Sequence, residues 1–204
     1  MKFTIHKNDI LDVLSKVQGL TNRKTNMTIT QTVLIQALDA AVSICATDLE
    51  TGFEGVYSAE VEEAGAICLN SRKLFEIIRD FPSDRIRLWQ VENQRVEIGE
   101  KSLLYHLMGM NPDDFPVIPK MSDVAYFEMD GAAFRRMIDR TAGIQGTGED
   151  KREHVLGVFM DQVGTDGGKR VRMASTDGGR LAVTGHDFGP DTDVPFEAGA
   201  LIPK

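Results

Sequence analysis

The residues of this chain whose side chains could do chemistry are scattered along it. The four histidines lie far apart, and none forms a pair at the spacing of metal ligands or of a catalytic triad; they are His6, His106, His154 and His186. The carboxylates of Asp113-Asp114 could serve as acid and base, but in a proline-rich stretch such side chains are usually solvated. We therefore expect no enzyme activity, no bound metal and no cofactor.

Two short motifs resemble nucleotide-handling loops but lack the companions that such loops need. Asp187-Phe188-Gly189 matches a kinase metal-binding triplet, yet no catalytic-loop set accompanies it, so we expect a turn there. The glycine-rich run at 143–148 follows a predicted helix instead of joining a strand to a helix start. Neither motif predicts nucleotide binding.

The composition is that of a folded acidic protein. With 204 residues, of which 42% are hydrophobic, the chain can form one large domain or two small ones. Cys45 and Cys68 each lie in an apolar stretch, which favours free buried thiols over a disulfide or a zinc site. No apolar run has the length of a membrane span and the N-terminus lacks a secretory signal, so we expect a cytoplasmic protein.

Two segments have patterns that suit partner binding. In 176–183, Gly178-Gly179 permits a close approach of backbone, and Arg180-Leu181 follows at once. The net charge of −8 excludes DNA binding by bulk attraction, but cations gather locally on or beside predicted helices, at Arg23, Lys24, Arg72, Lys73, Arg79, Arg135, Arg136 and Arg140. A plain hairpin and solvated helix faces explain the same patterns, so both interpretations stay open from the residues alone.

A long internal repeat underlies these segments. A strand and helix over 3–19, with Asn8 as the expected cap, recur over 127–143 with Asp130 as the cap. Further on, Ala46-Thr47-Asp48 is echoed by Ser175-Thr176-Asp177, and the run 63–67 by the run 197–201. Self-similarity over this length predicts duplicated domains. We expect a complete domain at 1–120 and an incomplete copy at 121–204, which ends before its second helix.

The first copy predicts an α+β fold. A capped amphipathic helix begins at Ser71 and is closed by Pro82, and the prolines of the linker 111–120 favour extended backbone. Each copy then reads as strand, helix and three strands, repeated once, with two helices packed on one side of antiparallel sheets. The remaining strand-like segments are 32–38, 41–47, 52–61, 85–91, 95–99 and 103–108.

Four stretches together resemble the bacterial DNA polymerase III beta subunit, the sliding clamp. They are 1–5, 71–75, 114–116 and above all 174–182, in the same order and spacing over essentially the whole chain. The resemblance implies the DNA-clamp fold and a homodimeric ring of six similar domains whose helices line a central hole. It also implies a processivity factor in DNA replication, which encircles duplex DNA without sequence preference. The implied protein partners are the DNA polymerase III alpha subunit, the clamp loader and other proteins with a clamp-binding motif.

The resemblance also assigns roles to residues. It places Arg23 or Lys24, and Arg72, at DNA-facing positions, and we add the helix cations Arg135, Arg136 and Arg140. It places partner peptides at Val155, Thr176, Gly178, Gly179, Arg180 and Leu181, and the ring interface at Lys73, Tyr105 and Leu107. The chain departs from the family at Glu149, where a polar DNA contact is frequent, and at Gly179, where histidine is common.

Two alternatives belong to other classes. A protein-interaction module of the same fold would never close a ring, and a hydrolase or nucleotidyltransferase would use scattered acidic residues such as Asp177. Because the second copy is incomplete, we expect this chain alone not to encircle DNA.

Overall fold

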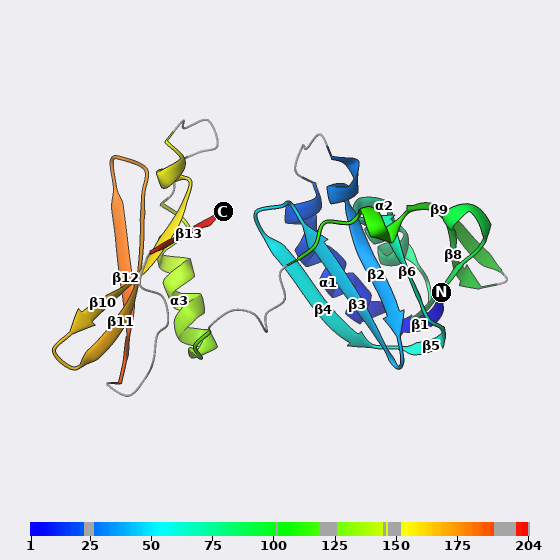
Figure 1. Ribbon diagram of the computed structural model, residues 1–204, viewed down its shortest axis with the longest axis horizontal. Helices are drawn as coiled ribbons and strands as arrows, with labels where there is room; N and C mark the ends of the chain where they lie inside the picture. Colours follow the sequence, from blue (N-terminus) through cyan, green and yellow to red (C-terminus); the bar gives the residue numbers. More distant parts are fainter. Residues whose placement is uncertain are drawn as a thin grey trace. The chain divides into compact units, whose positions relative to one another are not determined.

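A computed structural model of the chain shows two compact units, Met1–Ile118 (unit 1) and Pro119–Lys204 (unit 2) (Figure 1). No helix in the part of the chain that the structure describes has the length and apolar character needed to cross a membrane. The described residues are 1–22, 27–100, 102–118, 126–144, 146, 152–189 and 199–203.

The described residues of unit 1 form two α-helices and antiparallel strands, as the sequence predicts, and the strands make a single sheet. The strands lie in the order β4-β3-β2-β6-β9-β8-β7-β1-β5, and only Ala59 separates β4 at one end from β5 at the other. The sheet therefore comes close to closing on itself. The elements are β1 (Lys2–His6), α1 (Lys7–Thr21), η1 (Thr28–Gln31), β2 (Thr32–Leu38), β3 (Ala41–Thr47), β4 (Gly52–Ser58), β5 (Glu60–Glu63), β6 (Gly65–Asn70), α2 (Ser71–Asp80), β7 (Arg85–Gln90), η2 (Glu92–Gln94), β8 (Arg95–Glu100), β9 (Leu103–Met110) and η3 (Pro112–Asp114).

The core of unit 1 lies between the sheet and its two helices, which cover the same face of β2 and β3 (Figure 1). Ile10 and Leu14 of α1 and Leu74 of α2 are fully buried there, because apolar residues at helical spacing form one stripe. The side-chain amide of Gln18 donates to Ser71 Oγ over 3.0 Å and joins the two helices.

The first helix of unit 1 differs from the sequence prediction at both ends, whereas the second helix starts where the sequence predicts. α1 begins at Lys7, directly after the extended His6, so Asn8 lies inside the helix and does not cap it. The helix also continues past Gly19 to Thr21. α2 begins at Ser71, as predicted, and Asn70 caps it, with its side chain accepting from the Lys73 amide at 3.0 Å.

Two other segments of unit 1 are more broken than predicted. The strand expected over 52–61 divides at Ala59, whose amide donates to Ala40 at 3.0 Å and turns the chain from one end of the sheet to the other. The linker expected to be extended begins with the short turn η3, where Pro112 takes a first-turn position and Asn111 caps the Asp113 amide at 3.2 Å.

Unit 2 repeats the first half of unit 1. Its sheet order, β12-β11-β10-β13, corresponds strand by strand to β4-β3-β2-β6. The Asp130 side chain accepts from the Ala133 amide at 2.7 Å, which confirms the expected cap of α3. Met137 of α3 packs on Val158, Val171 and Met173 in a small core. The elements are α3 (Gly131–Thr141), η5 (Glu153–Val155), β10 (Gly157–Thr165), β11 (Gly168–Thr176), β12 (Leu181–Phe188) and β13 (Ala200–Pro203).

Three sequence predictions in unit 2 are wrong. The segment 127–129 forms no strand, and Phe127 packs edge-on against Phe188 with ring centroids 5.6 Å apart. Asp187 and Phe188 lie in β12 rather than in a turn. The sequence echo aligns Leu201 with Ile67. In the structure Leu201 pairs with Phe159 as Cys68 pairs with Leu34, so Leu201 is the counterpart of Cys68. That shift of one residue moves Leu201 to the other face of the sheet.

Candidate functional site

The segment that joins β11 to β12 is a closely hydrogen-bonded turn. Thr176 Oγ1 donates to the Arg180 carbonyl at 2.6 Å and accepts from the Gly178 amide at 3.0 Å. Asp177 Oδ1 accepts from the amides of Gly179 and Arg180 at 3.0 and 2.8 Å. Gly178 has φ of 90°, a conformation in which glycine carries no steric cost. The predicted residues 176–180 therefore form one ordered structure.

Charge strengthens this turn. The Arg180 guanidinium donates to Asp177 Oδ2 at 2.7 Å, and together with the backbone amides of Arg180 and Gly179 it lowers the pKa of Asp177 to about 2. The carboxylate is therefore ionised at neutral pH and holds the arginine in place. Asp177 thus orients the Arg180 side chain at the turn.

Beside the turn lies an exposed apolar row across the sheet. Phe159 of β10 pairs with Leu201 on one side and with Ala174 on the other, and Ala174 pairs with Val183 of β12. Phe159, Leu201 and Val183 are 42%, 41% and 56% exposed, and Leu181 at the end of the turn is 68% exposed. We call Leu201, Phe159, Ala174 and Val183 the unit 2 row.

The sequence interpretation identified Leu181 but missed the other exposed residues of this face. The signal was present in β12, where Leu181 and Val183 lie on one face and Ala182 and Phe188 lie on the other. The strand therefore carries apolar side chains on both faces, although the helix covers only one of them. Val155, by contrast, is 2% exposed and contacts Gly146, so it lies beneath the surface of this region.

Four of the predicted DNA-facing cations lie in the described part of the chain, and all four are exposed: Arg72, Arg135, Arg136 and Arg140. Arg72 is joined to Glu76 at 3.1 Å, and Arg135 approaches Asp139 at 3.8 Å. The described residues offer no ion pair to the exposed Arg136 and Arg140. Arg23, Lys24 and Glu149, also part of the DNA prediction, lie outside the described residues.

The residues expected at a ring interface lie in different surroundings. Tyr105 and Leu107 are on β9, whose residues 103–108 pair with β8 along one edge. The Tyr105 ring packs on Phe81 with centroids 6.2 Å apart, and Leu107 is 8% exposed. Lys73 stands apart from them on α2. Most of the Leu107 side chain is therefore buried in unit 1 itself.

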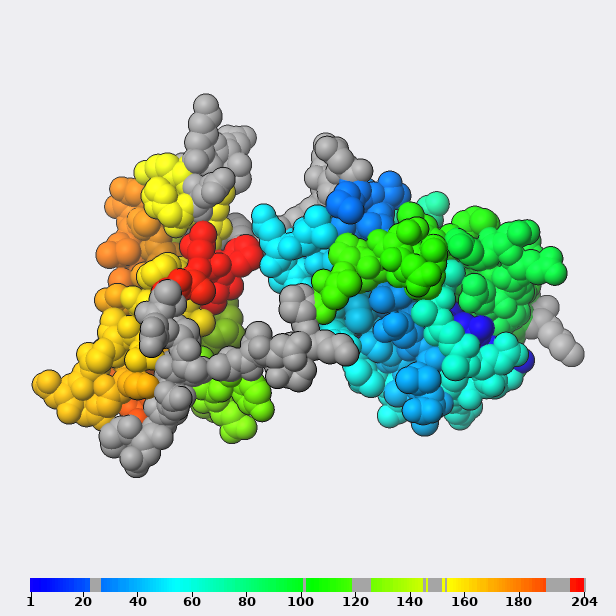
Figure 2. Space-filling view, in the orientation of Figure 1, coloured from blue at the N-terminus to red at the C-terminus, as the bar shows by residue number. Residues whose placement is uncertain are grey.

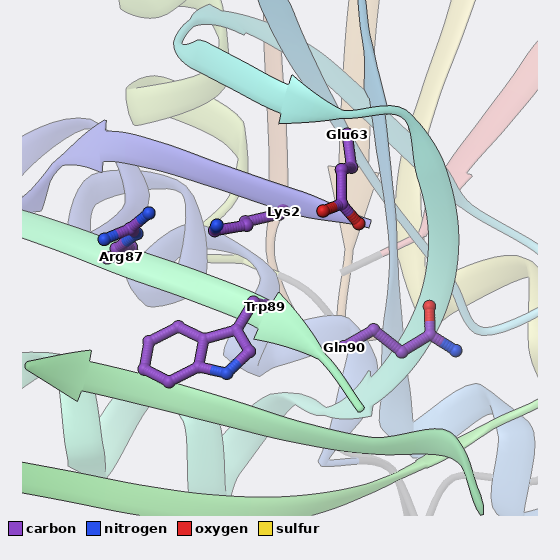
Figure 3. Close-up of a pocket in the computed structure, with 5 residues that line it drawn as sticks. All are labelled: Lys2, Glu63, Arg87, Trp89 and Gln90. Carbon is purple, nitrogen blue, oxygen red and sulfur yellow. The ribbon is translucent and has the colours of Figure 1, made fainter. Parts of the chain in front are cut away.

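A separate polar hollow of about 300 Å³ lies over β1 and β7 (Figure 3). Lys2, Arg87 and Trp89 lie side by side in it. Lys2 and Arg87 both form ion pairs with Glu62, at 2.8 and 2.6 Å. Over the described part of the chain, no three His, Cys, Asp or Glu side chains gather into a possible metal site.

Comparison with known proteins points to one family. Residues 1–119 match the family model described as DNA polymerase III beta subunit, N-terminal domain. The chain is 29% identical over 204 residues to a beta sliding clamp of Chlamydia trachomatis and 27% identical over 190 residues to that of Escherichia coli. These alignments cover 100% and 93% of this chain, and 47% and 50% of the relatives. The chain thus spans about half the length of the curated relatives it matches.

Solved structures show the same similarity in three dimensions. The Caulobacter crescentus polymerase III beta structure matches with a TM-score of 0.87 and 27% identity, over 100% of this chain and 54% of that one. A sliding clamp from Bartonella birtlesii, solved bound to griselimycin, matches with a TM-score of 0.86 and 25% identity, over the same shares of the two chains.

Proposed function

This chain belongs to the DNA polymerase III beta subunit family, the bacterial sliding clamps, and we propose on that basis that it acts as part of a processivity clamp. In this role it carries no catalytic group. It contributes a surface that slides on duplex DNA and a surface that docks the polymerase, the clamp loader and other proteins through short peptide motifs. In the complete clamp, two copies form a closed ring.

The turn at 176–180 and the apolar surface beside it carry the proposal for peptide docking. Arg180 is held by Asp177 at 2.7 Å, and Leu181 next to it is 68% exposed. A rigid cation beside an exposed aliphatic side chain suits a peptide with an apolar anchor, because such anchors supply most of the affinity in short-motif recognition. Thr176, Gly178 and Gly179 keep that pair in position.

A binding measurement tests this docking surface. A fluorescent peptide with the clamp-binding motif of a bacterial polymerase is titrated with the chain. Leu181→Ala and Arg180→Ala should each weaken binding about tenfold, since each removes an anchor. Arg170→Ala is the matched control, because Arg170 is an exposed arginine paired with Asp187 at 2.6 Å on the same sheet. Equal effects of all three changes would refute the assignment.

The helix cations support the proposal of a DNA-facing surface. Arg72 on α2 and Arg136 and Arg140 on α3 are exposed, and an acidic chain can still meet phosphates through such local positive charge. Contacts of this kind are weak and indifferent to sequence, with dissociation constants on the order of 10⁻⁴ to 10⁻⁶ M, which permits sliding. A ring retains DNA by topology, so tight binding is unnecessary.

We assign the ring interface to the edge of β9 beside Tyr105, as the family implies. The test is the oligomeric state of the complete protein: a dimer that Tyr105→Arg converts to a monomer supports the assignment. Lys73→Ala and Leu107→Ala separate the other two predicted residues, and we expect Leu107→Ala to act mainly by destabilising unit 1, where Leu107 is 8% exposed.

A further inference from the structure

The turn of unit 2 has a close counterpart in unit 1. Thr47 Oγ1 donates to the Thr51 carbonyl at 2.9 Å and accepts from the Leu49 amide at 3.0 Å. Asp48 Oδ1 accepts from the amides of Glu50 and Thr51 at 3.1 and 2.7 Å. Each of these four bonds corresponds to one in the turn at 176–180, and Leu49, with φ of 78°, takes the place of Gly178.

The apolar face beside the unit 1 turn is also the counterpart of the unit 2 row. Leu34 pairs with Cys45 and with Cys68, as Phe159 pairs with Ala174 and Leu201. We call Leu34, Cys45 and Cys68 the unit 1 row. These three residues lie on the face opposite the helices, since their neighbours in the strands form the helix-facing core.

The two rows differ in what covers them. In unit 1, Phe115 and Ile118 pack on the row, and Cys45, Cys68 and Phe115 are only 7%, 0% and 8% exposed. Figure 2 shows this green stretch of chain lying across the blue and cyan strands of unit 1. The unit 2 row has its large side chains 41–56% exposed.

The covering segment, 112–118, is held by its side chains. The backbone hydrogen bonds described for it stay within its own turn, from Asp114 to Asn111 and from Phe115 to Pro112. Two apolar anchors three residues apart face the sheet, and Val117 between them is 94% exposed. Extended chain with spaced anchors is how short linear peptides bind grooves.

The start of β4 explains how unit 1 accommodates this segment. Gly52 stands where unit 2 has Leu181, because each follows its turn and pairs with the matching threonine. A Cβ at Gly52 would lie 3.0 Å from Ile118 Cγ2, so Ile118 occupies the space that a side chain there would need. Beyond the segment the same face continues into an apolar hollow of about 580 Å³, rimmed by the exposed Leu38 and Val56.

We propose that unit 1 carries a second peptide groove of the same design, which residues 112–118 close as an internal ligand. An extended peptide with an aromatic anchor and a branched aliphatic residue three positions later competes for this groove when the segment undocks. The inference that this groove resembles a partner-binding site rests on the proposed function of the turn at 176–180 and Leu181. The contact of Phe115 and Ile118 with the unit 1 row stands independently of it.

The two cysteines report directly on the internal ligand. Both thiols lie in the buried cluster that the segment helps to cover. Burial raises the pKa of the Cys45 thiol and raises the pKa of Cys68 to about 11, so neither reacts readily while the segment is docked. The variant Phe115→Ala/Ile118→Ala should react with a thiol reagent at least about tenfold faster than the wild type. Gly52→Leu keeps the Phe115 and Ile118 side chains but places a new side chain in the space that Ile118 occupies. This variant should accelerate the reaction as well.

A peptide added in trans completes the test. A synthetic peptide of residues 111–118 should slow thiol labelling of the Phe115→Ala/Ile118→Ala variant back toward the wild-type rate, and a peptide with both anchors replaced by alanine should not. Fluorescence of Trp89, the one tryptophan of the chain, checks that unit 1 stays folded. Unchanged thiol rates in both variants, or acceleration that the peptide fails to reverse, would overturn the proposal. Because the thiols report on unit 1 alone, failure of partner binding at Leu181 leaves this readout unaffected.

Discussion

Leu49 and Gly178 occupy the same position in two copies of one turn, with φ of 78° and 90°. A leucine pays a steric cost in this conformation that glycine avoids, on the order of 1 kcal/mol. We therefore expect Leu49→Gly to raise the free energy of unfolding of unit 1 by about 0.5–1 kcal/mol, although it removes a side chain. Urea denaturation followed by Trp89 fluorescence measures this change.

The controls for Leu49 are a leucine in ordinary backbone and the reverse change in unit 2. Leu38 is similarly exposed, at 65%, but lies in β2, so Leu38→Gly should destabilise unit 1. Gly178→Leu should weaken unit 2 for the opposite reason. If Leu49→Gly lowered the free energy of unfolding as much as Leu38→Gly, the backbone at Leu49 would not be strained.

Asp177 makes the stability of unit 2 depend on pH in a defined window. Its pKa is about 2 in the folded chain, below the usual value of 3.8, because Arg180 and two amides favour the ionised form. A lowered folded pKa contributes stability above pH 4, and that contribution is lost as pH falls from about 4 to 2. The wild type and Asp177→Asn should therefore differ in unfolding midpoint at pH 5 and converge near pH 2. A constant difference across this range would contradict the assignment.

At the scale of elements, the hairpin between β8 and β9 depends on one glycine. A Cβ at Gly99 would lie 2.1 Å from the Leu103 carbonyl oxygen, and the residue has φ of 133°. Gly99→Ala should thus cost about 2–4 kcal/mol of unfolding free energy, since backbone must move. Gly19→Ala is the matched control: it meets nothing within 4 Å inside α1 and should stabilise by up to about 1 kcal/mol. Both are measured by urea denaturation.

The cations of α3 should differ in their importance for DNA binding. Arg135 approaches Asp139 at 3.8 Å, whereas no ion pair is described for Arg136 or Arg140. In a plot of the logarithm of the binding constant against the logarithm of salt concentration, each unpaired arginine that contacts a phosphate contributes about one unit to the slope. Arg136→Ala and Arg140→Ala should each lower that slope by about one, and Arg135→Ala should lower it less. Fluorescence anisotropy with duplex DNA at several salt concentrations measures these slopes. Equal slopes for all three variants would contradict the prediction.

The elements could be predicted where periodicity is strong and not where long-range contacts decide. Strands such as 41–47 were predicted to the residue, because core residues recur at every second position, here Val42, Ile44 and Ala46. The break at Ala59 depends on Ala40, far along the chain, and no local pattern reveals it. The register error at Leu201 has the same origin. The similarity between 63–67 and 197–201 predicts a strand register that differs by one residue from the observed pairing of Leu201 with Phe159.

The candidate site divides in the same way. The turn at 176–180 was visible as threonine, aspartate and two glycines, whose hydrogen-bonding roles are local. The unit 2 row was not visible, because Phe159 and Leu201 become neighbours only when distant strands pair. The covering of Cys45 and Cys68 by Phe115 likewise joins residues that the sequence separates.

At the scale of the whole molecule, the two units have separate cores of unequal size. The core of unit 1 contains many fully buried side chains in a sheet that nearly closes, whereas the described core of unit 2 comprises Met137, Val158, Val171 and Met173. The two clusters share no residue. Because stability grows with the apolar area buried, unit 2 should open at a lower free energy than unit 1.

Ile44 and Met173 test this separation, because they hold matching positions in β3 and β11 and both are fully buried. Ile44→Ala and Met173→Ala should each cost about 2–5 kcal/mol, because each leaves a cavity. With separate cores, Met173→Ala accelerates amide exchange in β10–β12 and leaves β2–β4 unchanged, and Ile44→Ala does the reverse. Hydrogen exchange followed by mass spectrometry at low urea resolves the two sets of strands. A change that spread equally through both sets would mean that the units open together, and the smaller core of unit 2 would then owe its stability to unit 1.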